Sequence, residues 1–198
     1  MTVAGVLLAA GTSQRMGRPK ALLPYRGTTL LHHSAQTLCA TSCSPRIAVV
    51  SPEIVKGCWQ MKDVGVVLVV NPDPLRGLAS SLRMALDAIE SSAGADPVKG
   101  ILITLVDQPL VTPEHLNAVV AAGAATGLAA TSWPTTFGPP VFLYRSFFPA
   151  LKDLTGDFGA KKILQDNADQ VSLVAFPGAA LDIDDAADYG RLLSGEKA

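Results

Sequence analysis

A cluster of positive charge follows the first apolar segment of the chain. Arg15, Arg18 and Lys20 lie close together, whereas the first acidic residue is Glu53, although the whole chain contains 16 Lys and Arg against 17 Asp and Glu. Gly11 opens this stretch and allows the backbone to approach a ligand closely. Backbone N–H groups and fixed cations together attract polyphosphates. The sequence therefore predicts a polyphosphate-binding loop, with an ordinary basic surface loop as the alternative.

Two common glycine-rich phosphate motifs do not fit this stretch. The P-loop requires a second glycine where Met16 stands, and a Ser or Thr after its lysine, whereas Ala21 follows Lys20. The dinucleotide motif requires a glycine where the chain has Ser13. The predicted loop must therefore bind phosphates in another way.

Acidic residues stand out at two other places. Asp107 ends the apolar segment "GILITLVD", and Asp182 and Asp184 alternate on a predicted short strand, so that they share one face. A carboxylate at the carboxyl end of a strand, on the same rim as the basic loop, is suited to Mg²⁺ that bridges phosphate oxygens, and Asp107 occupies such a position. The alternatives are a turn residue at Asp107 and a helix cap at Asp184 or Asp185.

Short β-branched runs alternate along the chain with segments of helical periodicity. Strands that are apolar on both faces predict a parallel sheet with helices on either side. A three-layer α/β/α sandwich with a mostly parallel, Rossmann-like sheet results, and its ligands collect beyond the carboxyl ends of the strands. The predicted strands are 3–9, 46–51, 65–71, 100–107, 128–132, 140–144 and 171–176. The predicted helices are 28–40, 80–92, one that starts at Thr112-Pro113-Glu114, 147–154, 159–167 and 185–193.

Length and composition limit the classes of protein to consider. A chain of 198 residues that is 48% hydrophobic can bury one core, so residues 1–198 are expected to form a single domain. A formal net charge of −1 gives no reason to expect binding to nucleic acid or to an anionic membrane. The sequence shows no signal peptide, no apolar run long enough to span a bilayer, and an odd number of cysteines, so we expect a cytoplasmic protein with reduced thiols.

The basic loop resembles the signature of the MobA-like nucleotidyltransferases, L-A-x-G-x-S-x-R-M-G-x-x-K. In this chain the stretch reads Leu8-Ala9-Ala10-Gly11-Thr12-Ser13-Gln14-Arg15-Met16-Gly17-Arg18-Pro19-Lys20. Asp107-Gln108-Pro109 is similar to the family's D-x-P element, and the segment from Asp182 to Tyr189 is similar to its D-I-D-T-P-E-D-Y ending. The chain departs from that ending at Asp185, Ala186 and Ala187, which leaves open whether Asp182 or Asp184 is the metal ligand.

Two further segments resemble elements of the same family. The first, "NPDPLRGLASSL", matches N-x-x-x-x-x-G-x-x-S-S-L, and a helix cap would explain its Ser80 equally well. The second region contains G-x-P-x-x-F from Gly138 to Phe142 and G-D-x-G-A-[RK] from Gly156 to Lys161. Its glycine loop could receive the phosphate of an acceptor or could simply be a turn capped by Asp157.

The resemblance implies a nucleotidyltransferase with the fold of the nucleotide-diphospho-sugar transferases and with Mg²⁺ as cofactor. It assigns catalysis to Arg15, Lys20 and Asp107, and metal binding to Asp107 with Asp182 or Asp184. The implied nucleotide-binding residues are Leu8, Ala9, Ala10, Gly11, Arg15, Lys20, Asn71, Gly77, Ser80 and Ser81. The implied acceptor-binding residues are Gly138, Pro140, Asp157, Gly159 and Lys161.

Within this family, the loop and the D-x-P element most resemble those of the molybdenum cofactor cytidylyltransferases. The implied substrates are CTP and molybdopterin or the molybdenum cofactor, and the implied partner is an apo-molybdoenzyme in transient contact. Ala10 stands where the guanylyl branch more often has glycine. The alternatives are a guanylyltransferase for the same cofactor, a sugar-phosphate nucleotidyltransferase, and a non-catalytic protein that binds and delivers the nucleotide or cofactor.

Overall fold

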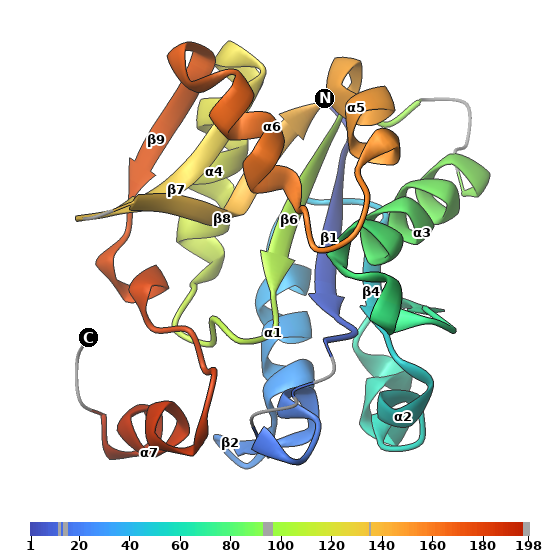
Figure 1. Ribbon diagram of the computed structural model, residues 1–198, viewed down its shortest axis with the longest axis vertical. Coiled ribbons are helices and arrows are strands. Elements are labelled where there is room, and N and C mark those ends of the chain that lie inside the picture. The colour runs from blue at the N-terminus through green and yellow to red at the C-terminus, as the bar shows by residue number, and fades with distance from the viewer. Residues whose placement is uncertain (12, 14–15, 93–96, 135, 196–198) are drawn as a thin grey trace.

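The protein is built around a twisted sheet that is visible at the centre of the molecule (Figure 1). The computed structural model describes the chain except for residues 12, 14–15, 93–96, 135 and 196–198. In spatial order the sheet contains β5 (Val67–Val70), β4 (Arg46–Val50), β1 (Val3–Ala9), β6 (Gly100–Leu105), β8 (Thr136–Tyr144), β7 (Leu128–Trp133) and β9 (Val171–Ala175). β8 is antiparallel to β6 and β7, and the other neighbouring pairs are parallel.

Helices cover both faces of the sheet, and each face has its own apolar core. On one face, α3 (Leu78–Ser91), α5 (Phe148–Asp153) and α6 (Ala160–Asp166) pack against the strands. On the other face lie α1 (Leu30–Cys39), α2 (Pro52–Val55), α4 (Pro113–Thr126) and, through Leu192, α7 (Ala186–Ser194). The shorter elements are η2 (Lys20–Leu22), β2 (Pro24–Tyr25), β3 (Thr28–Thr29), η3 (Cys58–Asp63), η4 (Pro74–Arg76), η5 (Arg145–Phe147), η6 (Ala168–Gln170) and η7 (Pro177–Ala180).

This architecture confirms the predicted three-layer sandwich with a mostly parallel sheet. The predicted elements recur with shifted ends. β8 begins four residues before the predicted strand because residues 136–138 pair with the end of β7 in a hairpin. Thr112 caps α4 as predicted, since its hydroxyl accepts a hydrogen bond from the N–H of His115, and Pro113 is the first helical residue.

The predicted short strand around Asp182 and Asp184 is wrong. Residues 181–184 have no regular secondary structure. The Ile183 N–H donates to the carbonyl of Asp107 at 3.0 Å, but no ladder follows, because the chain turns into α7 two residues later. Ile183 is fully buried, and it anchors the segment beside the end of β6.

β1 and β6 are neighbours whose carboxyl ends reach the same edge of the sheet. Leu8 lies opposite Leu105, and the Val106 N–H donates to the Leu8 carbonyl at 3.2 Å. The loop that follows β1 and the loop that follows β6 therefore leave the sheet side by side. This edge is where ligands bind in open α/β sheets.

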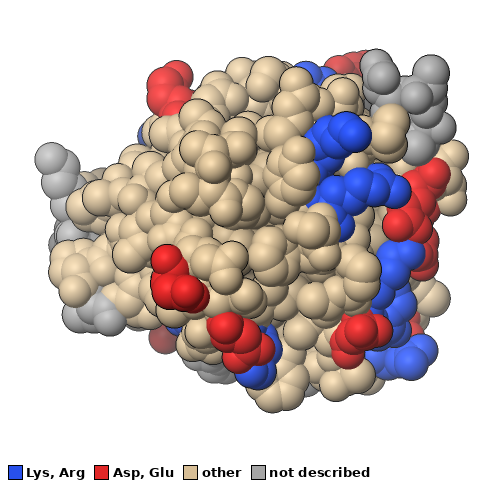
Figure 2. Space-filling model, turned by 90° about the horizontal axis from the view of Figure 1, so that it is seen from above, with Lys and Arg blue, Asp and Glu red and all other residues tan. Residues whose placement is uncertain are grey.

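The opposite edge of the molecule shows no concentration of one charge sign. Figure 2 views the molecule from above, from the side of the amino ends of β1 and β6, and shows Lys and Arg beside Asp and Glu on a mostly uncharged surface. Within the described residues, no helix is long and apolar enough to cross a membrane.

His115 lies in the interior, where α4 meets β7. Its Nε2 is 2.8 Å from the hydroxyl oxygen of Thr131, and that hydroxyl donates its proton to the Pro140 carbonyl. Nε2 must therefore be the donor, so the neutral ring is the Nε2–H tautomer. The ring also stacks on Phe176, with centroids 4.4 Å apart. Burial lowers the pKa of His115 below its usual 6.5.

This burial predicts a loss of stability in mild acid. Below pH 6.5 the unfolded chain takes up a proton that the folded protein resists, so the free energy of unfolding falls by up to about 1.4 kcal/mol per pH unit for this residue. A His115→Gln variant should show a shallower decline between pH 7 and pH 5 in urea unfolding monitored by circular dichroism. Equal slopes in the variant and the wild type would refute this role of His115.

Candidate active site

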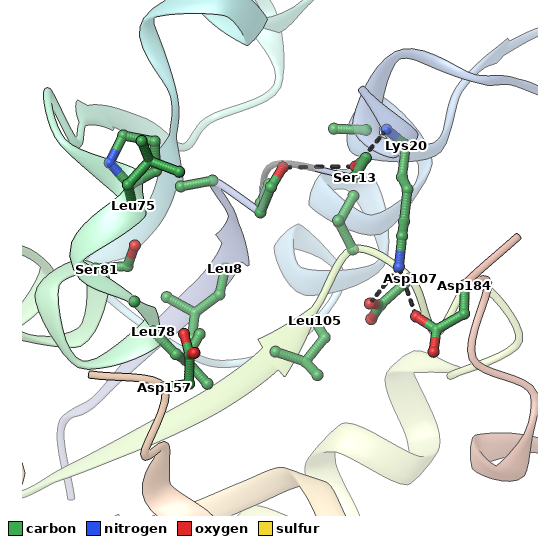
Figure 3. A pocket seen from close by; sticks show the side chains of 17 residues that line it. Leu8, Ser13, Lys20, Leu75, Leu78, Ser81, Leu105, Asp107, Asp157 and Asp184 are labelled. Atoms are coloured by element: carbon green, nitrogen blue, oxygen red, sulfur yellow. Dashed lines mark hydrogen bonds and ion pairs between the residues drawn. The ribbon is translucent and has the colours of Figure 1, made fainter. Parts of the chain in front are cut away.

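A cavity of about 570 Å³ opens at the carboxyl edge of β1 and β6 (Figure 3). The end of β1 and the basic loop form one wall, the η4 to α3 connection a second, and the loop after β6 a third. Its described lining is Leu8, Ala9, Ala10, Gly11, Ser13, Lys20, Ala21, Pro74, Leu75, Gly77, Leu78, Ser81, Leu105, Val106, Asp107, Asp157 and Asp184. Segments far apart in the sequence therefore meet around one space.

Lys20 connects the basic loop to the acidic residues. Its Nζ lies 2.8 Å from Oδ1 of Asp184 and 3.5 Å from Oδ2 of Asp107 (Figure 3). The backbone holds this side chain in place, because the Lys20 N–H donates to the Ser13 hydroxyl at 3.0 Å. The Lys20 side chain is only 14% exposed, so its charge is weakly screened by water.

Asp107 lies two residues past the end of β6. Its Oδ1 is buried and accepts no hydrogen bond from any described residue. Burial raises the pKa of Asp107, and the nearby Lys20 ammonium opposes this rise. An unpaired oxygen on a buried carboxylate is costly unless a cation or a hydrogen-bond donor satisfies it.

Asp182 and Asp184 occupy different environments on either side of buried Ile183. Asp184 lines the cavity and contacts Lys20, whereas Asp182 is not among the described lining residues. Asp182 has an exposed outer side, yet reduced hydration and then the charge of Asp107 raise its pKa to about 6. The geometry thus brings Asp184, rather than Asp182, to the pair formed by Lys20 and Asp107.

The carboxylates fit a hard divalent cation, although they do not form a three-ligand cage. Asp107 and Asp184 supply oxygen ligands of the kind that Mg²⁺ and Mn²⁺ prefer, and they already share one cation, the Lys20 ammonium. Among the residues that the structure describes, no group of three His, Cys, Asp or Glu side chains is arranged to bind a metal. Phosphate oxygens and water would have to complete the coordination.

Gly77 brings the opposite wall of the cavity close to another loop. Its backbone has φ +85° and ψ 179°, a conformation that is essentially restricted to glycine, and it precedes the first residue of α3. A Cβ at this position would lie 2.3 Å from the backbone carbonyl of Gly156. The Ala79 N–H donates to that same carbonyl at 3.1 Å. The two glycine loops that were predicted to bind nucleotide and acceptor are therefore in direct contact.

Hydrogen bonds from the buried side chain of Asn71 hold the start of α3 in place. Asn71 is 2% exposed, and its side-chain amide donates to the hydroxyls of Ser80 and Ser81 at 2.8 and 2.9 Å. Ser80 in turn donates to the Gly77 carbonyl at 2.7 Å. Of these three polar side chains, Ser81 lines the cavity. Ser80 is not the cap of α3, because the capping position belongs to Gly77.

The predicted acceptor residues separate into two groups. Asp157 lines the cavity on the side of Leu78, away from Lys20 (Figure 3), and Gly159 packs against Leu78, where a Cβ would lie 2.6 Å from the leucine side chain. The Pro140 carbonyl accepts a hydrogen bond from the Thr131 hydroxyl within the sheet. The Lys161 ammonium donates to the Thr136 hydroxyl at 3.3 Å. Gly138, Pro140 and Lys161 are not among the described residues that line the cavity.

The sequence did not identify several lining residues, and one predicted residue cannot be placed. Ser13 was seen only as part of the loop signature, whereas Leu75, Leu78 and Leu105 gave no signal, because isolated apolar residues look the same in a core and in a ligand cavity. Arg15, predicted to be catalytic and to bind nucleotide, lies outside the described residues.

The chain is similar in sequence to a known protein family and to several known proteins. The model of the MobA-like NTP transferase domain matches residues 5–171. Purine catabolism protein PucB of Bacillus subtilis is 33% identical over 172 residues, which cover 81% of this chain and 80% of PucB. Nicotine blue oxidoreductase of Paenarthrobacter nicotinovorans is 29% identical over 202 residues, with 96% of each chain covered. A probable molybdenum cofactor guanylyltransferase of Rhodopirellula baltica is 35% identical over 119 residues, or 60% of this chain and 54% of that protein.

A solved structure shares the whole architecture. Rv0371C of Mycobacterium tuberculosis H37Rv, in complex with manganese, superposes with a TM-score of 0.80 at 31% identity and covers 98% of this chain and 99% of that one.

The close contact at Gly77 predicts different effects for two glycine substitutions. Gly77→Ala should lower the free energy of unfolding by about 3 kcal/mol, because the added methyl group combines backbone strain with a clash. Gly11→Ala is the matched control, since a Cβ there meets no described atom within 4 Å, so it should change stability little, and because Gly11 lines the cavity we expect any effect to appear in nucleotide binding. Urea unfolding and nucleotide titration would measure both effects, and equal stabilities of the two variants would contradict this account of Gly77.

Proposed function

The chain belongs to the MobA-like NTP transferase family, and from this premise we propose that it transfers CMP from CTP to the terminal phosphate of molybdopterin or the molybdenum cofactor, releasing pyrophosphate. It is a nucleotidyltransferase related to molybdenum cofactor guanylyltransferases. The choice of CTP and of this acceptor is the proposal. The observation that supports nucleotidyl transfer is the group formed by Lys20, Asp107 and Asp184 at one end of the cavity.

The proposed reaction requires two anions to be aligned and their repulsion reduced. An oxygen of the acceptor phosphate attacks the α-phosphorus of CTP, the bond from that phosphorus to the bridging oxygen breaks, and its electron pair leaves with pyrophosphate. The acceptor phosphate is already anionic, so no general base is needed. The residues of the site then have to position both substrates and stabilise the leaving group.

The charged residues divide this work in the proposal. Lys20 would place its ammonium against the phosphates, and Arg15 would add a second positive charge. Asp107 and Asp184 would hold Mg²⁺, which when bound neutralises phosphate charge. The unpaired Oδ1 of Asp107 supports this role, because it is a buried acceptor that the described protein groups leave unsatisfied.

The remaining walls would hold the nucleoside. Leu8, Ala9 and Gly11 line one side of the cavity. Ser81 lines the other side, where the hydrogen bonds made by Asn71 fix the start of α3. Ala10 also lines this space. In the proposal its methyl group would narrow the pocket for the base and so favour a pyrimidine nucleotide over a purine nucleotide.

Asp157 would contribute to recognition of the acceptor in a specific way. A carboxylate repels a phosphate, so Asp157 would instead accept hydrogen bonds from N–H or O–H groups, while the acceptor phosphate would lie towards Lys20. Gly159 would shape the loop through its contact with Leu78. An acceptor would have to extend beyond this cavity to reach Gly138, Pro140 or Lys161.

A second candidate is guanylyl transfer to the same cofactor. The relative from Rhodopirellula baltica, named a probable molybdenum cofactor guanylyltransferase, favours it over the 119 aligned residues. The resemblance to nicotine blue oxidoreductase adds a redox reaction as an outcome to be tested. A non-catalytic delivery protein would have no need for two carboxylates placed to hold a metal beside a lysine.

Pyrophosphate release tests these alternatives directly. The purified protein would be assayed with Mg²⁺ or Mn²⁺, with each of CTP, GTP, ATP and UTP, and with or without molybdenum cofactor. Release with CTP that requires the acceptor supports the proposal, and release with GTP alone supports the guanylyl reaction. Nucleotide binding without release from any nucleotide would overturn the transferase proposal for this acceptor, and ultraviolet absorbance of a redox cofactor bound to the purified protein would indicate redox chemistry.

The proposal predicts a selective effect of removing Lys20. Lys20→Ala should lower turnover about 100-fold, because the lost charge matters most as negative charge moves to pyrophosphate, whereas nucleotide affinity should change much less. Lys99→Ala is the matched control, since Lys99 is an exposed lysine that immediately precedes β6, at the edge of the sheet opposite the cavity, and its loss should leave turnover with CTP unchanged. Steady-state kinetics with nucleotide titration would separate the two quantities. Full turnover in Lys20→Ala would exclude the proposed role.

A further inference from the structure

Hydrogen bonds tie the C-terminal segment to the active-site loops at points both before α7 and within it. The Ile183 N–H donates to the Asp107 carbonyl at 3.0 Å, and the Gln108 side-chain amide donates to the Ala179 carbonyl at 3.2 Å. The Tyr189 hydroxyl donates to the carbonyl of Pro24, four residues after Lys20. The segment from Ala179 to Tyr189 therefore contacts both sequence regions that supply the charged residues of the site.

Asp188 makes contacts that a simple helix cap does not require. Asp185 is the N-cap of α7, and its carboxylate accepts the N–H groups of Ala187 and Asp188. Asp188 returns the bond to the Asp185 N–H at 3.0 Å, which completes a capping box. The same Oδ2 of Asp188 also accepts the N–H of Asp184 at 2.8 Å. This extra bond fixes the residue that carries the carboxylate at the cavity.

The other oxygen of Asp188 is held separately. Oδ1 accepts a hydrogen bond from the guanidinium of Arg191, one turn further along α7. The carboxylate is therefore clamped between a cation on one side and two backbone N–H groups on the other. Charge-assisted bonds of this kind restrict rotation more strongly than neutral ones.

We propose that Asp188 is a positioning residue for divalent-cation binding, which acts by fixing the backbone of Asp184. The inference rests on the proposed function, in which Asp107 and Asp184 hold the metal. Partners of metal ligands set the orientation of those ligands, and their loss reduces metal affinity about 10- to 100-fold in other proteins. Asp188 plays this part through the backbone, without touching the cation.

Metal affinity provides a readout that does not depend on turnover. Mn²⁺ would be titrated into the full-length protein, alone and with CTP, and free Mn²⁺ measured by electron paramagnetic resonance. Asp188→Ala removes both acceptor oxygens, and Asp188→Asn keeps one oxygen that can accept both backbone N–H groups. Arg191→Ala removes only the partner of the second oxygen. Asp185→Ala removes the N-cap of the same helix but leaves the bond from Asp184 to Asp188 in place.

The expected order of affinities is specific. Asp188→Ala should bind Mn²⁺ about 10- to 100-fold more weakly than the wild type, whereas Asp188→Asn should restore most of the affinity. Asp185→Ala should lower the melting temperature while keeping near wild-type affinity, and Arg191→Ala should have a small effect. If Asp188→Ala does not fold, Asp188→Ser, which shortens the side chain but keeps it polar, replaces it with the same expectation.

The outcomes separate the inference from the proposed function. If Asp184→Ala loses affinity while Asp188→Ala binds Mn²⁺ like the wild type, the positioning role is overturned and the metal role of Asp184 stands. An equal loss in Asp185→Ala and Asp188→Ala would mean that only the stability of α7 matters, which also overturns it. If the wild type binds no Mn²⁺, or Asp184→Ala binds it normally, the inference falls together with the proposed metal site.

Discussion

The ammonium of Lys20, shared between the carboxylates of Asp107 and Asp184, is the interaction on which this site depends. It joins a loop near the start of the chain to the end of β6 and to a segment 164 residues away from Lys20. Each partner is partly removed from water, so separating them would leave a poorly hydrated charge. In the proposed reaction this arrangement would change on ligand binding, because phosphates would compete for the ammonium and a divalent cation would compete for the carboxylates.

The fold supplies the rigidity that this cluster needs. β1 and β6 lie in register at the centre of the sheet, so the loops after them start from fixed positions. Across the cavity, the close approach of Gly77 to Gly156 and the buried amide of Asn71 hold the start of α3. Each of these braces comes from backbone geometry or a buried hydrogen bond, which resist displacement better than exposed side-chain contacts.

The relatives of this protein have names that refer to different reactions or processes, although their sequences align with much of this chain. The residues proposed to hold phosphate and metal lie at the strand ends, whereas the cavity continues towards Leu75, Leu78 and Asp157. A site built in this way separates the charged end from the part that distinguishes substrates. Differences among family members are then expected at the far end, where apolar residues and one carboxylate leave room for varied ligands.

The sequence by itself determined the order of strands and helices, the fold class, and the residues at the ends of β1 and β6. Apolar periodicity, Thr112 at a helix start and the density of the loop signature are local signals, and each was sufficient for its element. Only the tertiary structure decided that Asp184 rather than Asp182 meets Lys20, and that the two glycine loops touch. In the structure, Gly138, Pro140 and Lys161 are not among the described residues that line the cavity. These contacts join residues that are far apart in the sequence. Their distances are set by the packing of the whole chain, which no local sequence pattern encodes.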